Sequence, residues 1–121
     1  MSPCTVTIDV HDTTAFIRLS GSVIHEDVPS ISQQAKTLLT QGCQTVIFDF
    51  SKTDRVNSNG IAAVISTVNA ASATGAVVVV HNPNDHFRVL LITTKLISVL
   101  NVSHGTDADA LACAAMVRHQ T

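Results

Sequence analysis

Apolar and polar residues alternate over two short stretches near the N-terminus. From residue 5 to 10 every second residue is apolar, and the same pattern holds from residue 15 to 19. Such alternation predicts half-buried strands, and the polar turn His11-Asp12-Thr13 between them predicts an antiparallel hairpin. Residues 22–28 would then lead to a first helix.

Four later stretches repeat their apolar residues at helical spacing. The first is expected to begin near Pro29 and to stop at Gly42, and the second to run to residue 73 or 74, before Gly75. The third is expected to start at Asn82-Pro83 as N-cap and first helical residue, and the last at a capping pair of Thr106 and Asp109. The apolar stripes are Ile31, Ala35, Leu38 and Leu39; Ile61, Val64, Ile65 and Val68; Phe87, Leu90, Leu91 and Thr94; and Leu111, Ala115 and Val117.

Continuous apolar runs between these helices predict buried strands. The first run is Val46-Ile47-Phe48, in an expected strand over residues 45–50, and the second is residues 76–80. Residues 99–103 are expected to form a last strand. Asp49 is expected at the carboxyl end of the first run, and residues 51–59 are expected to form a loop. The order β-β-α-β-α-β-α-β-α predicts one α/β domain over residues 1–121, with a mostly parallel sheet extended by the antiparallel hairpin.

Composition narrows the class of partner. Seven basic and nine acidic residues, with no basic run, argue against nucleic-acid binding. The longest apolar runs are too short to span a bilayer, so we expect no direct membrane insertion. The three cysteines have no metal-like spacing and suit a reducing cytoplasm. We therefore expect a cytoplasmic protein, and the sequence leaves its assembly open, including a homo-oligomer.

Motifs of the common enzyme classes are missing from the sequence. There is no Gly-rich phosphate loop and no Gly-x-Ser-x-Gly elbow, and the six histidines are scattered. We therefore expect no catalytic residues, no metal and no cofactor. Asp49 and Asp54 have two interpretations, a charged rim that orients a nucleotide, metal or kinase, or a strand-end cap and a solvated turn. We favour the turn for Asp54 and leave Asp49 open.

Ser58 stands at the expected start of the second helix and also has two interpretations. It is either the helix N-cap, or a phosphoacceptor whose added charge would lie at the positive end of the helix. Asn57 offers an alternative cap, which would leave the Ser58 hydroxyl free. Gly60 removes a side chain that would crowd a docking partner.

These residues carry a resemblance that covers nearly the whole chain. It resembles a STAS domain, the fold of bacterial anti-sigma factor antagonists, in which a strand ends in Asp-Leu-Ser, Asp-Ser-Ser-Gly-Leu opens a helix, and Gly precedes the next strand. The corresponding residues here are Phe48-Asp49-Phe50-Ser51, Asn57-Ser58-Asn59-Gly60-Ile61 and Gly75, followed by residues 96–102 and 107–111. The resemblance implies a STAS-like α/β fold, with a mixed, mostly parallel sheet, an N-terminal antiparallel hairpin and about four helices.

The resemblance also implies partners. Such domains bind an anti-sigma factor that is also a serine kinase, phosphorylation of the serine aligned with Ser58 breaks the complex, and a phosphatase restores it. Related domains sit in stress-signalling complexes, on transporters or on lipid-trafficking ATPases. The sequence departs from the family pattern in having Asn57 for Asp and Asn59 for a small hydroxyl residue. It also lacks the usual Asp of Gly-x-Leu-Asp near Gly21, with Glu26 and Asp27 following later.

We therefore arrive at a first hypothesis and two rivals. The first is a phospho-regulated binding module that releases a sigma factor or signalling partner by binding an anti-sigma factor. Its expected surface is residues 57–61 together with Val89 and Ile92 of the third helix, although these two would equally suit extra core. The second is a constitutive adaptor on a transporter or lipid-trafficking ATPase. The third, an enzyme with a ligand at the strand ends, has the least support.

Overall fold

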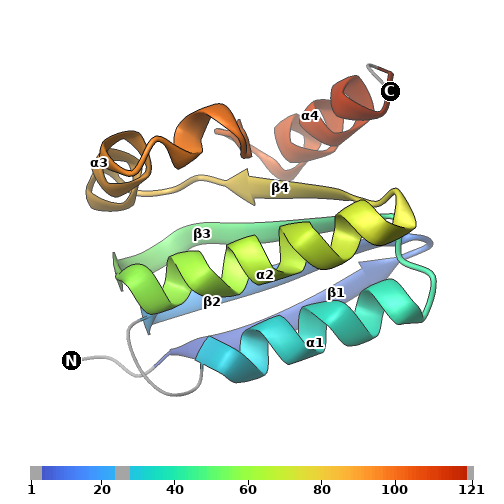
Figure 1. The fold of residues 1–121 in the computed structure, drawn as a ribbon, viewed down its shortest axis with the longest axis horizontal. Coiled ribbons are helices and arrows are strands. Elements are labelled where there is room, and N and C mark those ends of the chain that lie inside the picture. Colours follow the sequence, from blue (N-terminus) through green and yellow to red (C-terminus); the bar gives the residue numbers. More distant parts are fainter. Residues whose placement is uncertain (1–3, 24–27, 120–121) are drawn as a thin grey trace.

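The computed structural model describes residues 4–23 and 28–119, in which one five-stranded sheet is covered by helices on both faces (Figure 1). The sheet order is β1-β2-β3-β4-β5, with β1 antiparallel to β2 and the other pairs parallel. This confirms the predicted mixed sheet and its hairpin. The elements are β1 Thr5–His11, β2 Thr14–Val23, α1 Val28–Thr40, β3 Thr45–Val56, α2 Ser58–Thr74, β4 Val77–His81, α3 Asp85–Thr93, the 3-10 turn η1 Leu96–Ser98, β5 Asn101–Ser103 and α4 Asp107–His119.

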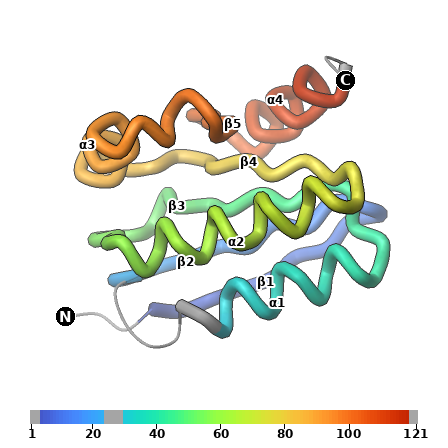
Figure 2. Tube along the Cα trace, viewed as in Figure 1, coloured from blue at the N-terminus to red at the C-terminus, as the bar shows by residue number. Residues whose placement is uncertain are grey.

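The larger core lies on the face covered by α1, α2 and α3. Helices α1 and α2 pack side by side over this face (Figures 1 and 2). Phe48 and Phe50 of β3 point into this core. The ring centres of Phe50 and of Phe87 in α3 are 4.8 Å apart in an edge-on arrangement. On the opposite face, α4 covers a smaller cluster with Ala110 and Ala114. Alternation along each strand therefore divides the apolar residues between two cores.

Strand β3 is longer than the sequence predicted. It continues through the segment expected to be a loop and ends at Val56, so Asp49 is not at its carboxyl end, and that prediction is wrong. The pairing with β2 shifts register twice, between Arg18 and Ser20 and between Gly21 and Ser22. These β-bulges let a polar stretch stay in the sheet while Thr53 and Val56 still face inward. Asp49 does mark the last pair between β3 and β4, opposite His81.

The predicted helix ends hold for α1 and α2 and fail for the start of α3. Gly42 and Gly75 both have a positive φ just past their helices. The N-cap of α3 is Asn84, two residues after the predicted Asn82, and its side chain accepts the N–H of Phe87 at 2.8 Å. Asn82 instead exchanges two hydrogen bonds with the backbone of Gly105, at 2.8 and 2.9 Å. Tertiary contacts thus decide which asparagine begins the helix.

Helix α4 turns a different side inward than its sequence suggested. Leu111 and Ala115 were expected on the inner stripe, but both are exposed, and the buried residues are Ala110 and Ala114. The error arises because α4 carries apolar residues on all sides, so its spacing does not single out one face. The predicted capping pair is confirmed, since the Asp109 carboxylate accepts the N–H of Thr106 at 2.8 Å.

Candidate functional site

The start of α2 presents Ser58 to solvent. Asn57 is the N-cap, and its side-chain oxygen accepts the N–H of Asn59 at 3.0 Å. The Asn57 N–H in turn donates to the carbonyl of Val23 at 3.4 Å, which ties the helix start to the end of β2. Ser58 is exposed, and its hydroxyl has no hydrogen-bond partner among the described residues. Of the two interpretations of Ser58, the structure assigns the cap to Asn57.

The electrostatics of this helix start favour an added anion. The first turn of α2 contains no acidic residue. The N–H groups of Ser58 and Gly60 lie in that turn, where the helix supplies no acceptor for them. A helix N-terminus with uncompensated N–H groups attracts negative charge. A phosphate on Ser58 would therefore find favourable surroundings without any change of fold.

Gly60 and Ile61, predicted to contact a partner, are buried in this chain. A Cβ at position 60 would lie 2.5 Å from Cγ1 of Val56 and 3.3 Å from the carbonyl oxygen of Val23. Packing inside the protein is therefore sufficient reason for glycine at position 60. The accessible part of the predicted surface consists of Ser58 and Asn59, with Asn57 half-buried.

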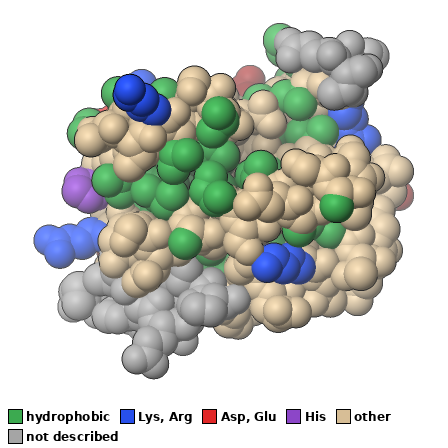
Figure 3. Space-filling model, viewed as in Figure 1, with side chains coloured by type: hydrophobic (Ala, Val, Ile, Leu, Met, Phe, Trp, Pro, Cys, Tyr) green, Lys and Arg blue, Asp and Glu red, His purple; other side chains and the backbone are tan. Residues whose placement is uncertain are grey.

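An apolar ridge on α3 lies at the same end of the molecule as Ser58 (Figures 1 and 2). Val89 and Ile92 are 60% and 56% exposed, which excludes the alternative that they are extra core in this chain. Hydrophobic side chains gather over α3 and the adjoining part of α2 (Figure 3). The Asn84 side chain links the start of α3 to β3, because it donates to the carbonyls of Thr53 and Asp54 at 3.2 and 3.1 Å. We call Ser58, Asn59, Val89 and Ile92 the docking surface.

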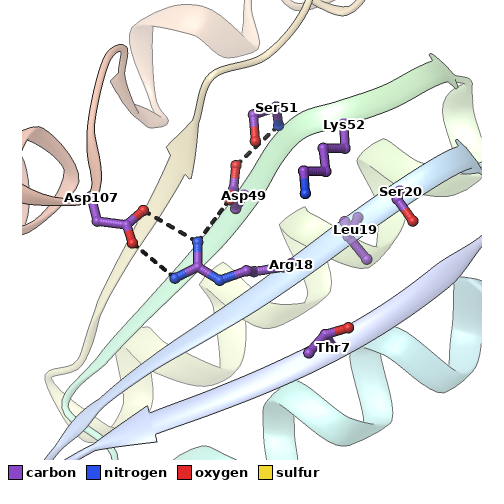
Figure 4. A pocket seen from close by; sticks show the side chains of 8 residues that line it. All are labelled: Thr7, Arg18, Leu19, Ser20, Asp49, Ser51, Lys52 and Asp107. Atoms are coloured by element: carbon purple, nitrogen blue, oxygen red, sulfur yellow. Dashed lines mark hydrogen bonds and ion pairs between the residues drawn. The ribbon is translucent and has the colours of Figure 1, made fainter.

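A second polar site lies on the opposite face of the sheet, where α4 leaves β1 and β2 uncovered. Arg18 of β2 contacts three carboxylates, those of Asp9 at 3.1 Å, Asp49 at 2.9 Å and Asp107 at 2.9 Å. Its guanidinium also lies 4.6 Å from the centre of the Phe16 ring. Arg18, Asp49 and Asp107 border an open pocket of about 560 Å³ (Figure 4). Its lining residues are Thr7, Arg18, Leu19, Ser20, Asp49, Ser51, Lys52 and Asp107.

Asp49 has a structural role in this site. One carboxylate oxygen accepts from Arg18, and the other accepts the N–H of Ser51 at 3.0 Å, directly beside the first bulge of β3. Burial by itself raises the pKa of Asp49, but the hydrogen bonds from Ser51 and Arg18 outweigh it and hold the pKa below its usual value. The ionised carboxylate of Asp49 therefore stabilises the bulge. Asp54, which was favoured as a solvated turn residue, is exposed and lies within β3.

Spacing in the sequence gave no sign of the Arg18 cluster or of Asn84. Arg18 and Asp107 are 89 residues apart, and each stands at an ordinary polar position of its own element. Within residues 4–23 and 28–119, no group of three or more His, Cys, Asp or Glu side chains is arranged to hold a metal ion. In the same part of the chain, no helix combines the length and the apolar character needed to cross a bilayer. Glu26 and Asp27, named above for their place in the family pattern, lie outside the described residues.

The family follows from a match that spans most of the sheet. Residues 6–101 match the family model described as "Mlab, STAS domain". The chain belongs to the STAS domain family. This confirms the resemblance recognised from the motif around Ser58. A comparison with curated protein sequences gives no significant match.

Solved structures share the fold at low sequence identity. The unphosphorylated anti-sigma factor antagonist SpoIIAA superposes with a TM-score of 0.79 at 22% identity, covering 88% of this chain and 93% of that one. The phosphorylated form of the Bacillus cell-fate determinant SpoIIAA superposes with a TM-score of 0.74 at 23% identity, covering 89% of this chain and 97% of that one. A sulfate transporter family protein from Wolinella succinogenes superposes with a TM-score of 0.69 at 15% identity, covering 93% of both chains. These three structures therefore share the fold of this chain.

Proposed function

We propose that this STAS domain is a phospho-regulated binding module of the anti-sigma factor antagonist type. In its unmodified form it binds an anti-sigma factor that is also a serine kinase, and so releases a sigma factor or another signalling partner. The kinase phosphorylates Ser58, the complex separates, and a phosphatase restores the binding form. The domain itself carries out no catalysis.

One observation carries this proposal. Ser58 is the exposed first residue of α2, and Asn57 caps the helix in its place. The hydroxyl is therefore accessible to a kinase, and its modification does not remove a cap. The apolar side chains of Val89 and Ile92 on α3, at the same end of the molecule, supply the contact area that a neutral hydroxyl alone lacks. Fold similarity to the two forms of SpoIIAA adds support from a related architecture.

The proposal is tested with the serine kinase encoded nearest to this gene. The purified domain is incubated with that kinase and ATP, and its intact mass is measured. We expect a gain of one phosphoryl group in the wild type and in Ser72→Ala, and no gain in Ser58→Ala. Ser72 is the matched control because it is an exposed serine farther along the same helix. Modification of Ser58→Ala to the wild-type extent would contradict the assignment.

The second candidate is a constitutive adaptor on a transporter or lipid-trafficking ATPase. The favouring observation is the neutral helix start, in which Asn57 stands where the family pattern has Asp. An adaptor would use the same docking surface without a phosphorylation cycle. The intact-mass measurement separates the two candidates, because an adaptor gains no phosphoryl group. An adaptor also binds its ATPase equally well in wild type and Ser58→Ala.

A further inference from the structure

Helix α4 has a second apolar side that the fold does not use. Ala110 and Ala114 face the sheet, while Leu111 and Met116 are 44% and 64% exposed. Ala115 is also exposed. A surface helix usually turns polar residues to solvent, so this outer side is unusual. Figure 1 shows α4 at the far end of the molecule from α3, which separates it from the docking surface.

Along one side of α4, an acidic residue, two apolar residues and a basic residue follow one another. Asp107, Leu111, Ala115 and Arg118 follow one another at spacings of four, four and three residues, which places them along one side of the helix. The stripe is acidic at its N-terminal end, apolar in the middle and basic at its C-terminal end. Contacts with the sheet hold both charged ends. Asp107 is bound by Arg18 and remains 53% exposed. Arg118 donates to the side chain of Gln44 at 3.1 Å and to the hydroxyl of Thr45 at the start of β3.

Two copies of this stripe are complementary to each other when they run in opposite directions. If two α4 helices lie antiparallel about a two-fold axis that crosses the stripe midway between Leu111 and Ala115, Asp107 of each copy faces Arg118 of the other, and Leu111 faces Ala115. The large side chain then meets the small one, and each charge meets its opposite. A parallel arrangement would instead place like charges together. The helix dipoles also favour the antiparallel arrangement.

We infer that this chain forms an antiparallel homodimer through the Asp107–Leu111–Ala115–Arg118 stripe of α4. A helix of 13 residues is about 20 Å long. One such helix pair buries less surface than the roughly 1,200 Å² of a stable complex. The dimer is therefore weak and depends on concentration. It leaves Ser58, Val89 and Ile92 of both copies accessible, so that one dimer presents two docking surfaces.

Sedimentation equilibrium over a range of protein concentrations tests this inference. The wild type is expected to form dimers reversibly, and added salt is expected to weaken them by screening the two ion pairs. Leu111→Glu, which places a charge in the middle of the interface, should raise the dissociation constant about tenfold or more. Met116→Glu is the matched control, because Met116 is an exposed residue of the same helix outside the stripe. It should leave the dissociation constant within about twofold.

The contrary results are equally definite. A wild type that stays monomeric up to about 1 mM overturns the inference, since even a weak dimer is populated there. If Leu111→Glu and Met116→Glu raise the dissociation constant equally, α4 associates through non-specific hydrophobic contacts, and this result would also overturn the inference. Circular dichroism checks that both variants are folded, and Ala115→Glu replaces Leu111→Glu if the latter is not. Ile92→Glu, on the docking surface, should leave the dimer unchanged, which separates this test from the proposed function.

Discussion

The side-chain oxygen of Asn57 accepts the N–H of Asn59 at 3.0 Å, across the intervening Ser58. This bond completes the cap of α2 without using the serine hydroxyl. Ser58 therefore lies at the positive helix end, and its hydroxyl has no hydrogen-bond partner within residues 4–23 and 28–119. The consequences for stability and for binding can be measured separately.

Replacing Ser58 by Asp should leave the domain at least as stable as the wild type while it weakens partner binding. A carboxylate at this helix start should stabilise the domain by about 0.3–1 kcal/mol, whereas a partner docked on the helix would have to desolvate that charge. Thermal melts and binding titrations against the identified kinase check both expectations, with Ser58→Ala as the neutral control. Equal binding by wild type, Ser58→Ala and Ser58→Asp would favour the constitutive adaptor.

Replacing Asn57 by Ala should lower the free energy of unfolding by about 1 kcal/mol, because the N–H of Asn59 loses its acceptor. Asn57→Asp keeps an acceptor of the same shape and adds a charge that the helix dipole favours, so it should be neutral or stabilising. Urea unfolding of the three proteins provides the comparison. A loss in Asn57→Ala no larger than the error of the measurement would show that the cap contributes nothing here.

Replacing Gly60 by Ala should destabilise the domain by about 1–3 kcal/mol, although Ala is the better helix former. The added Cβ would lie 2.5 Å from Cγ1 of Val56, inside van der Waals contact. Val56→Ala removes that methyl group, so Gly60→Ala should be less costly in the Val56→Ala background. A double-mutant cycle by chemical denaturation measures this coupling. Strict additivity of the two changes would rule out the clash as the cause.

Acid should destabilise this domain through Asp49. The folded state holds the pKa of Asp49 below its usual value, so the folded state binds this proton less readily than the unfolded chain. The resulting stabilisation is complete above the unfolded pKa of about 4 and is lost as the pH falls through the lower folded pKa. Asp49→Asn should be less stable than wild type at pH 7, with a difference that shrinks at about pH 3. Unfolding free energies measured across this range show whether the two curves converge.

Local sequence patterns determined most of the elements of this protein. The alternation at the N-terminus, the apolar runs of β3 and β4 and the glycines at positions 42 and 75 indicate the hairpin, the buried strands and the helix ends. Asn57, Ser58 and Gly60 mark the start of α2 in the same way. These features are readable because each depends on the backbone preferences and periodicity of a few neighbouring residues.

Only the tertiary structure decided the features that join distant residues. The continuation of β3 to Val56 depends on its pairing with β2, and the choice of Asn84 over Asn82 depends on the carbonyls of β3. The Arg18 cluster joins three strands and α4. The inner side of α4 was not predictable either, because its residues are apolar all round and the sheet alone selects Ala110 and Ala114. In each case the deciding energy comes from contacts between segments far apart in the chain, for which the local pattern carries no information.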